Sequence, residues 1–154
     1  MSGERFTLDT NVLVYSVDDA APLRCHTARG VLARAASRDC HFTLQSISEF
    51  FAVVTRKKLV PAAEAAAQVS DWLDVFPTAT PSKNAVRAAL ALSVAGQASY
   101  WDGLLLATAA EAGCTAILTE DMADGAMLHG LRIVNPFAAG GLSAEAERLL
   151  GGAR

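Results

Sequence analysis

The sequence has few cysteines and no long apolar run, and both absences narrow the class of protein. Its three cysteines are widely separated in 154 residues, and none has a second cysteine or a histidine at zinc-ligand spacing. We therefore expect neither a disulfide framework nor a zinc site, and the thiols are predicted to be buried and reduced. The longest apolar stretches, such as residues 103–110, are far shorter than the roughly 20 residues that cross a bilayer, so no membrane association is expected.

An export signal and an excess of positive charge are also missing. The first residues include an acid and lead into only a short apolar stretch, unlike a secretory signal, so a cytoplasmic protein is expected. The net charge is −3, from 13 basic and 16 acidic residues, which gives no general attraction to nucleic acid. A polyanionic substrate would therefore need the help of a metal ion. The three histidines share no spacing with a serine or cysteine nucleophile, so a catalytic triad lacks support.

Short β-rich segments alternate with helical segments along the chain. This alternation predicts an α/β fold with three α/β/α layers, in which helices cover both faces of a central, mainly parallel sheet. Residues 1–137 are expected to form one domain, and residues 138–154 a tail or peripheral helix of the same domain. The expected strands are residues 6–8, 41–43, 115–119 and 131–134, and the expected helices cover residues 12–15, 22–35, 44–58, 61–73, 80–96 and 99–112.

Four carboxylates lie where predicted strands end or covering helices begin. Asp9 and Asp121 each follow a strand, while Glu49 and Asp102 lie in the early turns of helices. Each also has a purely local explanation: a helix cap for Asp9, capping boxes for Glu49 and Asp102, and a solvated turn for Asp121. In conjunction, however, all four can converge on the sheet edge where α/β folds bind ligands. Convergent carboxylates repel one another unless a divalent cation neutralises them.

The chemistry of these side chains predicts which cation they would bind. Hard oxygen ligands without histidine or cysteine partners suit Mg²⁺ or Mn²⁺, which complete their coordination with water and phosphate oxygens. Asp9, Asp102 and Asp121 are expected to bind the metal directly or through water. Glu49 is expected to bind it through water or to orient the nucleophile that attacks phosphorus.

Neighbouring polar residues are predicted to support the four acids. Thr10 is expected to hydrogen-bond a water on the metal or a phosphate oxygen, and Asn11 to fix the orientation of the carboxylates. Each residue also fits a local helix cap. Glu120 and Asp124 flank Asp121 as possible auxiliaries, so the identity of the main fourth acid stays open.

Four motifs follow one another in a specific order. Together they resemble the PIN-domain ribonucleases, most of all their VapC-type toxin members. The resemblance covers about residues 6–137 and maps the family's acids onto Asp9, Glu49, Asp102 and Asp121. The motifs are Leu-Asp-Thr-Asn-Val-Leu at 8–13, Ser-Glu-Phe at 48–50, Tyr-Trp-Asp-Gly-Leu-Leu at 100–105 and Leu-Thr-Glu-Asp-Met-Ala-Asp-Gly at 118–125.

The resemblance implies a Mg²⁺- or Mn²⁺-dependent endoribonuclease that hydrolyses RNA phosphodiester bonds. It also implies the toxin of a type II toxin-antitoxin system, usually a homodimer, whose partner antitoxin covers or invades the acidic cleft. The RNA target, the cut site and the number of metal ions are not indicated. Gly103 stands where such proteins commonly have alanine, which loosens the helix slightly.

Two alternative functions remain compatible with the residues. Asp9 follows the first strand, as the nucleophile of an aspartyl-phosphate-type phosphatase does, but Asn11 occupies the place of that family's second aspartate. The later lysine of that family also has no good counterpart. The other alternative is a catalytically inactive PIN-like module that binds RNA or protein without cutting.

Two groups of basic residues have no settled role. Arg24 projects near the apolar face of its helix in the first turn, where it is either a surface residue or a residue that points into a cleft. The run at residues 56–58 ends the helix that carries Glu49. It is interpreted either as a guide for RNA or as cations that complement the helix dipole.

Overall fold

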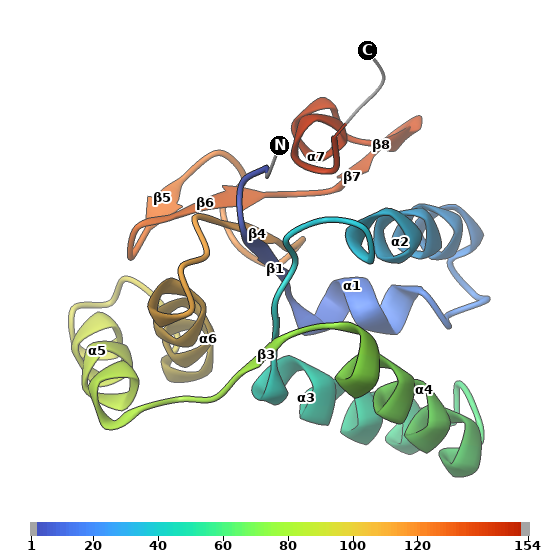
Figure 1. Cartoon of the computed structure of the whole chain (residues 1–154), viewed down its shortest axis with the longest axis horizontal. Coiled ribbons are helices and arrows are strands. Elements are labelled where there is room, and N and C mark those ends of the chain that lie inside the picture. Colours follow the sequence, from blue (N-terminus) through green and yellow to red (C-terminus); the bar gives the residue numbers. More distant parts are fainter. Residues whose placement is uncertain (1–2, 152–154) are drawn as a thin grey trace.

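A four-stranded sheet lies at the centre of the computed structural model, which describes residues 3–151 (Figure 1). Its strand order is β1-β4-β6-β5, in which β1, β4 and β6 are parallel and β5 pairs antiparallel with β6. The prediction of a central, mainly parallel sheet is confirmed. The strands are β1 (Phe6–Leu8), β4 (Ala116–Leu118), β5 (Met127–Leu128) and β6 (Leu131–Val134).

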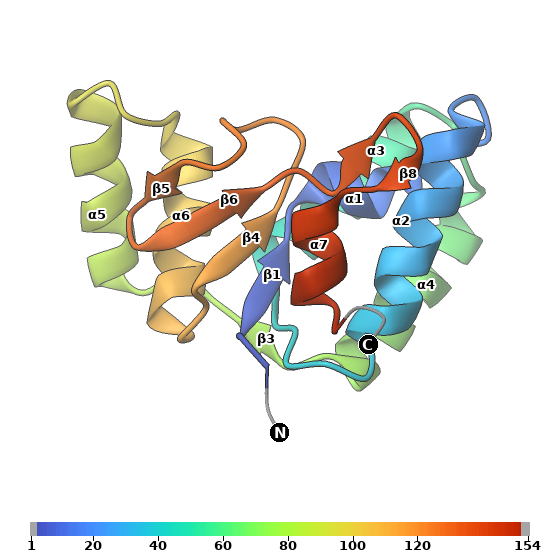
Figure 2. The same cartoon turned by 90° about the horizontal axis from the view of Figure 1, so that it is seen from above.

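Helices cover both faces of this sheet, so the predicted three-layer α/β/α arrangement is also confirmed. α7 lies on one face, and α6 lies on the other with α5 outside it (Figures 1 and 2). The helices are α1 (Thr10–Tyr15), α2 (Pro22–Ala35), α3 (Leu44–Arg56), α4 (Ala62–Val75), α5 (Lys83–Val94), α6 (Tyr100–Glu111) and α7 (Ala144–Leu149). Two small pairs complete the fold: β2 (Phe42–Thr43) with β3 (Thr78–Ala79), and β7 (Phe137–Ala138) with β8 (Gly141–Leu142).

The main core joins the beginning and the end of the chain. Phe6 of β1 and Phe50 of α3 are fully buried in it, because α3 presents its apolar residues at helical spacing. Ala146 of α7 and Leu150 just after it are also fully buried in this core. Part of the predicted peripheral tail is therefore packed against the rest of the molecule.

Gly103 has a packing role that its sequence context did not reveal. It lies in α6 against α5, where an added Cβ would come within 3.3 Å of the Cα of Ala89. A glycine lets the two helix backbones approach closely, which offsets its lower helix propensity. The same interface buries Ala85 and Ala107, so it is built from small residues.

Several element boundaries differ from the prediction. α5 begins after Ser82, whose hydroxyl accepts a hydrogen bond from the amide of Ala85. The expected cap, Thr80, instead belongs to the connection that follows β3. α3 ends at Arg56 rather than at Lys58, which has a φ of 55°. The three free cysteines are buried as predicted, and none of the described helices is long and apolar enough to span a membrane.

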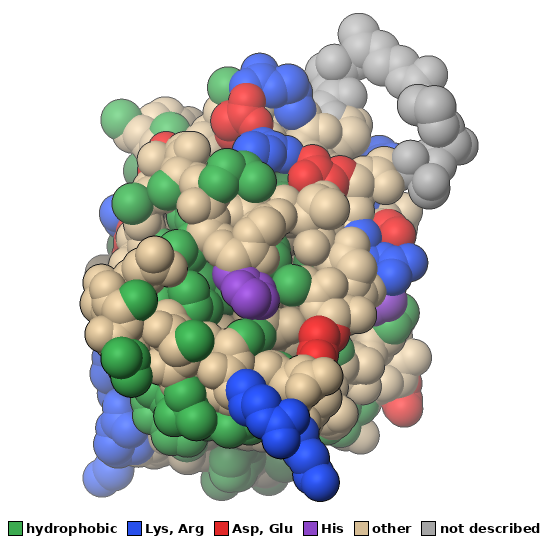
Figure 3. Space-filling model, turned by 90° about the vertical axis from the view of Figure 1, so that its left-hand side faces the viewer, with side chains coloured by type: hydrophobic (Ala, Val, Ile, Leu, Met, Phe, Trp, Pro, Cys, Tyr) green, Lys and Arg blue, Asp and Glu red, His purple; other side chains and the backbone are tan. Residues whose placement is uncertain are grey.

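The face formed by α5 has a mixed surface, with hydrophobic and basic side chains (Figure 3). Hydrophobic side chains gather on it and carboxylates are scattered (Figure 3). Leu90 and Val94 of α5 are 52% and 90% exposed.

Candidate functional site

A cavity of about 370 Å³ brings together the four acids that the sequence analysis selected. Asp9 and Asp121 lie beyond the carboxyl ends of β1 and β4, and Glu49 and Asp102 are contributed by α3 and α6. This is the edge at which parallel α/β sheets bind ligands. The lining residues are Asp9, Thr10, Asn11, Val14, Tyr15, Asp18, Glu49, Val53, Lys57, Asp102, Glu120 and Asp121.

Asp9 is the most buried of the four carboxylates, with 7% of the residue exposed. As N-cap of α1, it accepts a hydrogen bond from the amide of Thr10 at 2.7 Å, and its other oxygen accepts one from the Thr119 hydroxyl at 2.8 Å. Burial raises the pKa of Asp9 from 3.8 to about 6, although these hydrogen bonds act in the opposite direction. The charges of Asp102 and Asp121 raise the pKa further. Asp9 is therefore both a local cap and a cavity residue.

The amide of Asn11 connects the two acids that follow strands. Its Nδ2 lies 3.3 Å from Asp9 Oδ2 and 2.9 Å from Asp121 Oδ2, and donates to both. The same nitrogen contacts the Thr119 hydroxyl at 3.2 Å, and Asn11 Oδ1 accepts from the amide of Glu120 at 3.3 Å. These contacts fit the predicted role of Asn11 in orienting carboxylates.

The carboxylate of Glu49 does not cap its own helix but bonds side chains of α1 and of the first turn of α3. The N-cap of α3 is Thr43, so the capping-box interpretation of Glu49 is wrong. Its oxygens instead accept from the Thr10 hydroxyl at 3.2 Å and from Gln45 Nε2 at 3.1 Å. Thr10 thus contacts an acid of the site directly.

Asp102 combines a capping position with a place in the cavity. Its amide donates to the hydroxyl of Ser99, the N-cap of α6, at 3.1 Å, as the capping-box pattern predicts. Burial is the largest cause of a raised pKa at Asp102, opposed by a hydrogen bond with Ser99. The charges of Asp121 and Glu49 also raise the pKa of Asp102. The acids therefore repel one another across the cavity.

The cavity offers the oxygen ligands that Mg²⁺ and Mn²⁺ prefer, but the side chains are not arranged around one ion position. Within residues 3–151, no three carboxylate, histidine or cysteine side chains are grouped closely enough to hold a metal ion. Hydrogen bonds from Thr10 and Asn11 occupy carboxylate oxygens instead. The all-oxygen donor set and the electrostatic cost of the ionised Asp9 both fit a divalent cation, because a cation would offset that cost.

Glu120 is held by two partners at the rim of the cavity. It accepts from the Tyr15 hydroxyl at 2.5 Å and from Arg24 Nε at 2.7 Å. The hydrogen bond to Glu120 raises the pKa of Tyr15 to about 12. The Arg24 guanidinium also lies 5.6 Å and 5.4 Å from the centroids of the Tyr15 and Phe137 rings. Arg24 is thus an exposed residue that reaches the cavity through its ion pair.

Asp124 is placed away from the cavity by its backbone contact. Its carboxylate accepts the amide of Asn135 at 2.9 Å, and it is not among the residues that line the cavity. Of the three neighbouring acids, Asp121 is the one whose carboxylate accepts a hydrogen bond from Asn11. Glu120 and Asp121 both line the cavity, and Asp121 alone of the three is therefore linked through Asn11 to Asp9.

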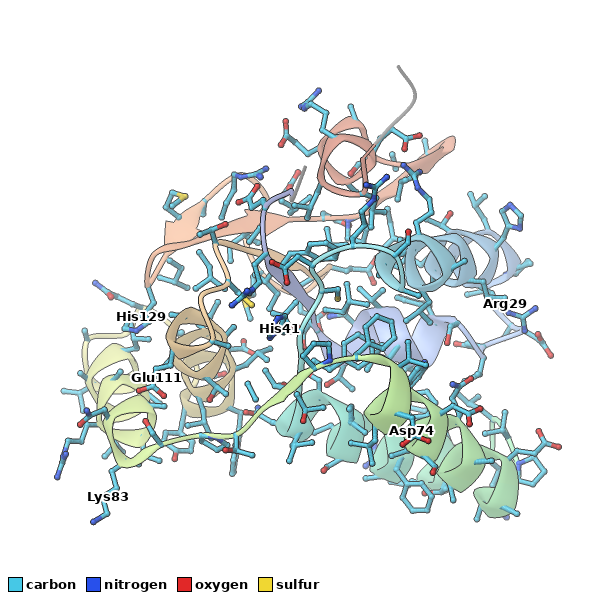
Figure 4. The ribbon with its side chains drawn as sticks, in the orientation of Figure 1. Arg29, His41, Asp74, Lys83, Glu111 and His129 are labelled. Carbon is cyan, nitrogen blue, oxygen red and sulfur yellow. The ribbon has the colours of Figure 1, made fainter. Side chains whose placement is uncertain are left out.

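Sequence reasoning did not single out three polar residues at the site: Thr119, Tyr15 and Asp18. Thr119 bonds Asp9 and accepts the amide of Asp121 at 3.1 Å, and its position between strand and acid was the available signal. Tyr15 had no such signal, because its partner Glu120 is 105 residues away. His41 lies just before β2 and His129 in the turn between β5 and β6, and neither lines the cavity (Figure 4).

Exchanging Asn11 for aspartate should destabilise the metal-free protein. Asn11→Asp replaces an amide donor between two carboxylates with a third negative charge, so we expect a loss of about 1–3 kcal/mol in the free energy of unfolding. Urea unfolding followed by circular dichroism measures the change. The matched control is Asn84→Asp on exposed α5, expected to stay within about 0.5 kcal/mol of wild type. Equal stability of both variants would contradict the bridging role of Asn11.

Comparison with protein families identifies the fold class. The PIN domain model matches residues 6–123, which is most of the chain, and the protein belongs to the PIN domain family. No curated protein sequence matches it significantly.

Two solved structures share this fold. One is VapC20 of Mycobacterium tuberculosis, described as a Sarcin-Ricin loop cleaving toxin. It is 18% identical with a TM-score of 0.60, over 75% of this chain and 91% of that chain. The other is VapBC2 from Rickettsia felis, bound to a DNA fragment from their promoter. It is 14% identical with a TM-score of 0.61, over 84% of this chain and 96% of that chain. At these identities the likeness concerns the fold.

Proposed function

We propose that this PIN-domain protein is a metal-dependent endoribonuclease and the toxin of a VapC-type toxin-antitoxin pair. One observation carries the proposal: Asp9, Glu49, Asp102 and Asp121, from four remote segments, line a single cavity. Membership of the PIN family and the fold shared with VapC20 and VapBC2 support it. A set of separate helix caps would not need to converge in this way.

The residues of the cavity have distinct proposed roles. Asp9, Asp102 and Asp121 would hold Mg²⁺ or Mn²⁺ directly or through water, and Glu49 would do so through water or orient the attacking water. When bound, the ion supplies a more acidic water and neutralises charge on the phosphate. Asn11 keeps the carboxylates of Asp9 and Asp121 oriented through its side-chain amide.

Lys57 is the cavity residue best suited to attract the RNA backbone. It is exposed and directly follows α3. It lines the same cavity as the four acids and carries the opposite charge. A lysine at this point offsets part of the negative field that would otherwise repel phosphate. This supports the interpretation of the basic run as an RNA guide.

The same acidic cavity is the proposed contact for a cognate antitoxin. A basic protein segment that enters it would neutralise the four acids and exclude RNA, because opposite potentials favour association. The protein is further proposed to act as a homodimer, as the family resemblance implies.

A digest of total RNA in Mn²⁺, in Mg²⁺ and in excess EDTA tests the activity. We expect new, defined RNA ends in the presence of the divalent cation and none in EDTA, because the four acids need a counter-ion. Mapping the ends gives the cut site. Binding of metal and RNA without new ends would favour the inactive PIN-like module. Release of phosphate from small phosphomonoesters without RNA cleavage would favour the phosphatase.

A further inference from the structure

We propose that a second pocket, beside the acidic cavity, holds a nucleobase next to the phosphodiester that is cut; this rests on the proposed ribonuclease function. The pocket has a volume of about 300 Å³ and shares Asp102 and Asp121 with the acidic cavity. These two side chains therefore separate the pocket from the acidic cavity and line both. The pocket is lined by Gln97, Ala98, Asp102, Asp121, Met122, Ala123, Ala126, Leu128 and Ile133.

The remaining walls of this pocket are mostly apolar. Ile133 of β6 is 1% exposed and belongs to the cluster that α6 buries against the sheet. Met122 and Leu128 are partly buried against the same cluster, so each presents a surface that is already fixed by packing. Ala123 and Ala126 have small side chains and leave the space between these walls open. Such walls suit the faces of an aromatic ring, and a methionine thioether packs well against one.

Gln97 supplies a polar group at the edge of the pocket. It is exposed and lies in the connection between α5 and α6. Its side-chain amide can both donate and accept hydrogen bonds, as the edge of a nucleobase requires. Small-molecule sites typically combine apolar walls with few polar groups and start at about 300 Å³, a volume that accommodates a single base.

Charge distinguishes the base from the other parts of a nucleotide. The ionisable side chains of this pocket are Asp102 and Asp121, which repel a phosphate that has no cation between them. A neutral ring is not repelled. An RNA strand with one phosphate in the acidic cavity can thus place the adjoining base in the apolar pocket, on the other side of Asp102 and Asp121. This contact is sequence-dependent, whereas the contacts of phosphate with the acids and Lys57 are not.

A filling substitution tests this assignment. Ala123→Trp places an indole where the base would lie, and Ala139→Trp makes the same change at another exposed turn, outside this pocket. Both variants and wild type cut a randomised oligoribonucleotide pool in Mn²⁺, and the ends are sequenced. We expect wild type to prefer one base beside the cut. Ala123→Trp should lose this preference and about tenfold in kcat/KM, while the control keeps both.

A binding measurement separates loss of the base contact from loss of the cleavage step or of folding. In an Asp9→Asn background, an oligoribonucleotide with an abasic residue at the preferred position should bind about tenfold more weakly than the intact one. Adding Ala123→Trp should remove this difference. Gln97→Leu, which leaves the apolar walls intact, should change the preferred base rather than abolish cutting.

The outcomes separate this inference from the proposed function. If wild type cuts RNA and Ala123→Trp keeps the same base preference and rate, the base pocket is overturned while the ribonuclease stands. The pocket would then fit an apolar side chain of a protein partner instead. If wild type cuts no RNA in any cation, both proposals are overturned together.

Discussion

Replacing Asp9 by asparagine is expected to lower the rate of Mn²⁺-dependent RNA cleavage by about 10²- to 10⁴-fold while the protein stays folded. Asp9 is the most buried of the four carboxylates, and the charges of Asp102 and Asp121 act on it across the cavity. Asparagine keeps the size and an oxygen for the α1 cap, so the loss should come from the missing negative charge. Initial rates on a defined RNA, with circular dichroism of both proteins, measure the effect.

A carboxylate outside the site provides the matched control for this substitution. Asp74 lies on α4 and does not line the acidic cavity (Figure 4). Asp74→Asn should leave the cleavage rate within about twofold of wild type, as expected for a surface change away from the site. If Asp9→Asn and Asp74→Asn cleaved equally well in preparations free of contaminating nuclease, Asp9 would have no catalytic role.

The metal-free protein should lose stability as the pH rises from about 4 to about 6. Burial raises the pKa of Asp9 from 3.8 to about 6, so in this window the folded state keeps a proton that the unfolded state has released. The difference corresponds to about 3 kcal/mol in favour of the protonated folded state, and this advantage is fully lost above the folded pKa. The raised pKa of Asp102 acts in the same direction.

Urea unfolding in EDTA at a series of pH values measures this loss. The Asp9→Asn variant is the internal reference, since it lacks the titrating carboxyl, and its stability should fall less over the same range. Saturating Mn²⁺ should remove most of the fall in wild type, because a bound cation stabilises the ionised acids. Parallel stability curves for wild type and Asp9→Asn would contradict the raised pKa.

The larger elements and the acids of the site were predictable from local pattern. The strands at residues 6–8 and 131–134 lie where they were expected. A short apolar run between two helical segments is typical of a buried strand, so these two could be predicted. Asp9 and Asp121 could be found because each directly follows a strand. Parallel strands bring their carboxyl ends to one edge, so topology alone implied their convergence.

The short strands were not predictable in the same way. β3, β5, β7 and β8 contain two residues each, too few to show a period of two. They exist because a neighbouring segment offers hydrogen bonds, as β6 does for β5. The start of α5 was misplaced for a related reason. Thr80 and Pro81 form a good local cap, but the chain is paired as β3 up to Ala79, and Ser82 is the residue that caps α5.

The hydrogen-bond and ion-pair partners of the acids could not be predicted from the sequence. Glu49 has a sound capping-box pattern, yet its carboxylate bonds Thr10 from another helix. The ion pair of Arg24 with Glu120 joins residues 96 positions apart. These choices depend on which side chains the fold brings together, and local spacing carries no information about them.

The burial of Ala146 and Leu150 has a consequence for where this domain ends. The match to the PIN domain model ends at residue 123, but the hydrophobic core continues to Leu150. Residues beyond this match therefore contribute to the same core as β1 and α3. α7 and Leu150 therefore shield the core from water on the sheet face opposite α6, although their sequence showed no recognisable pattern.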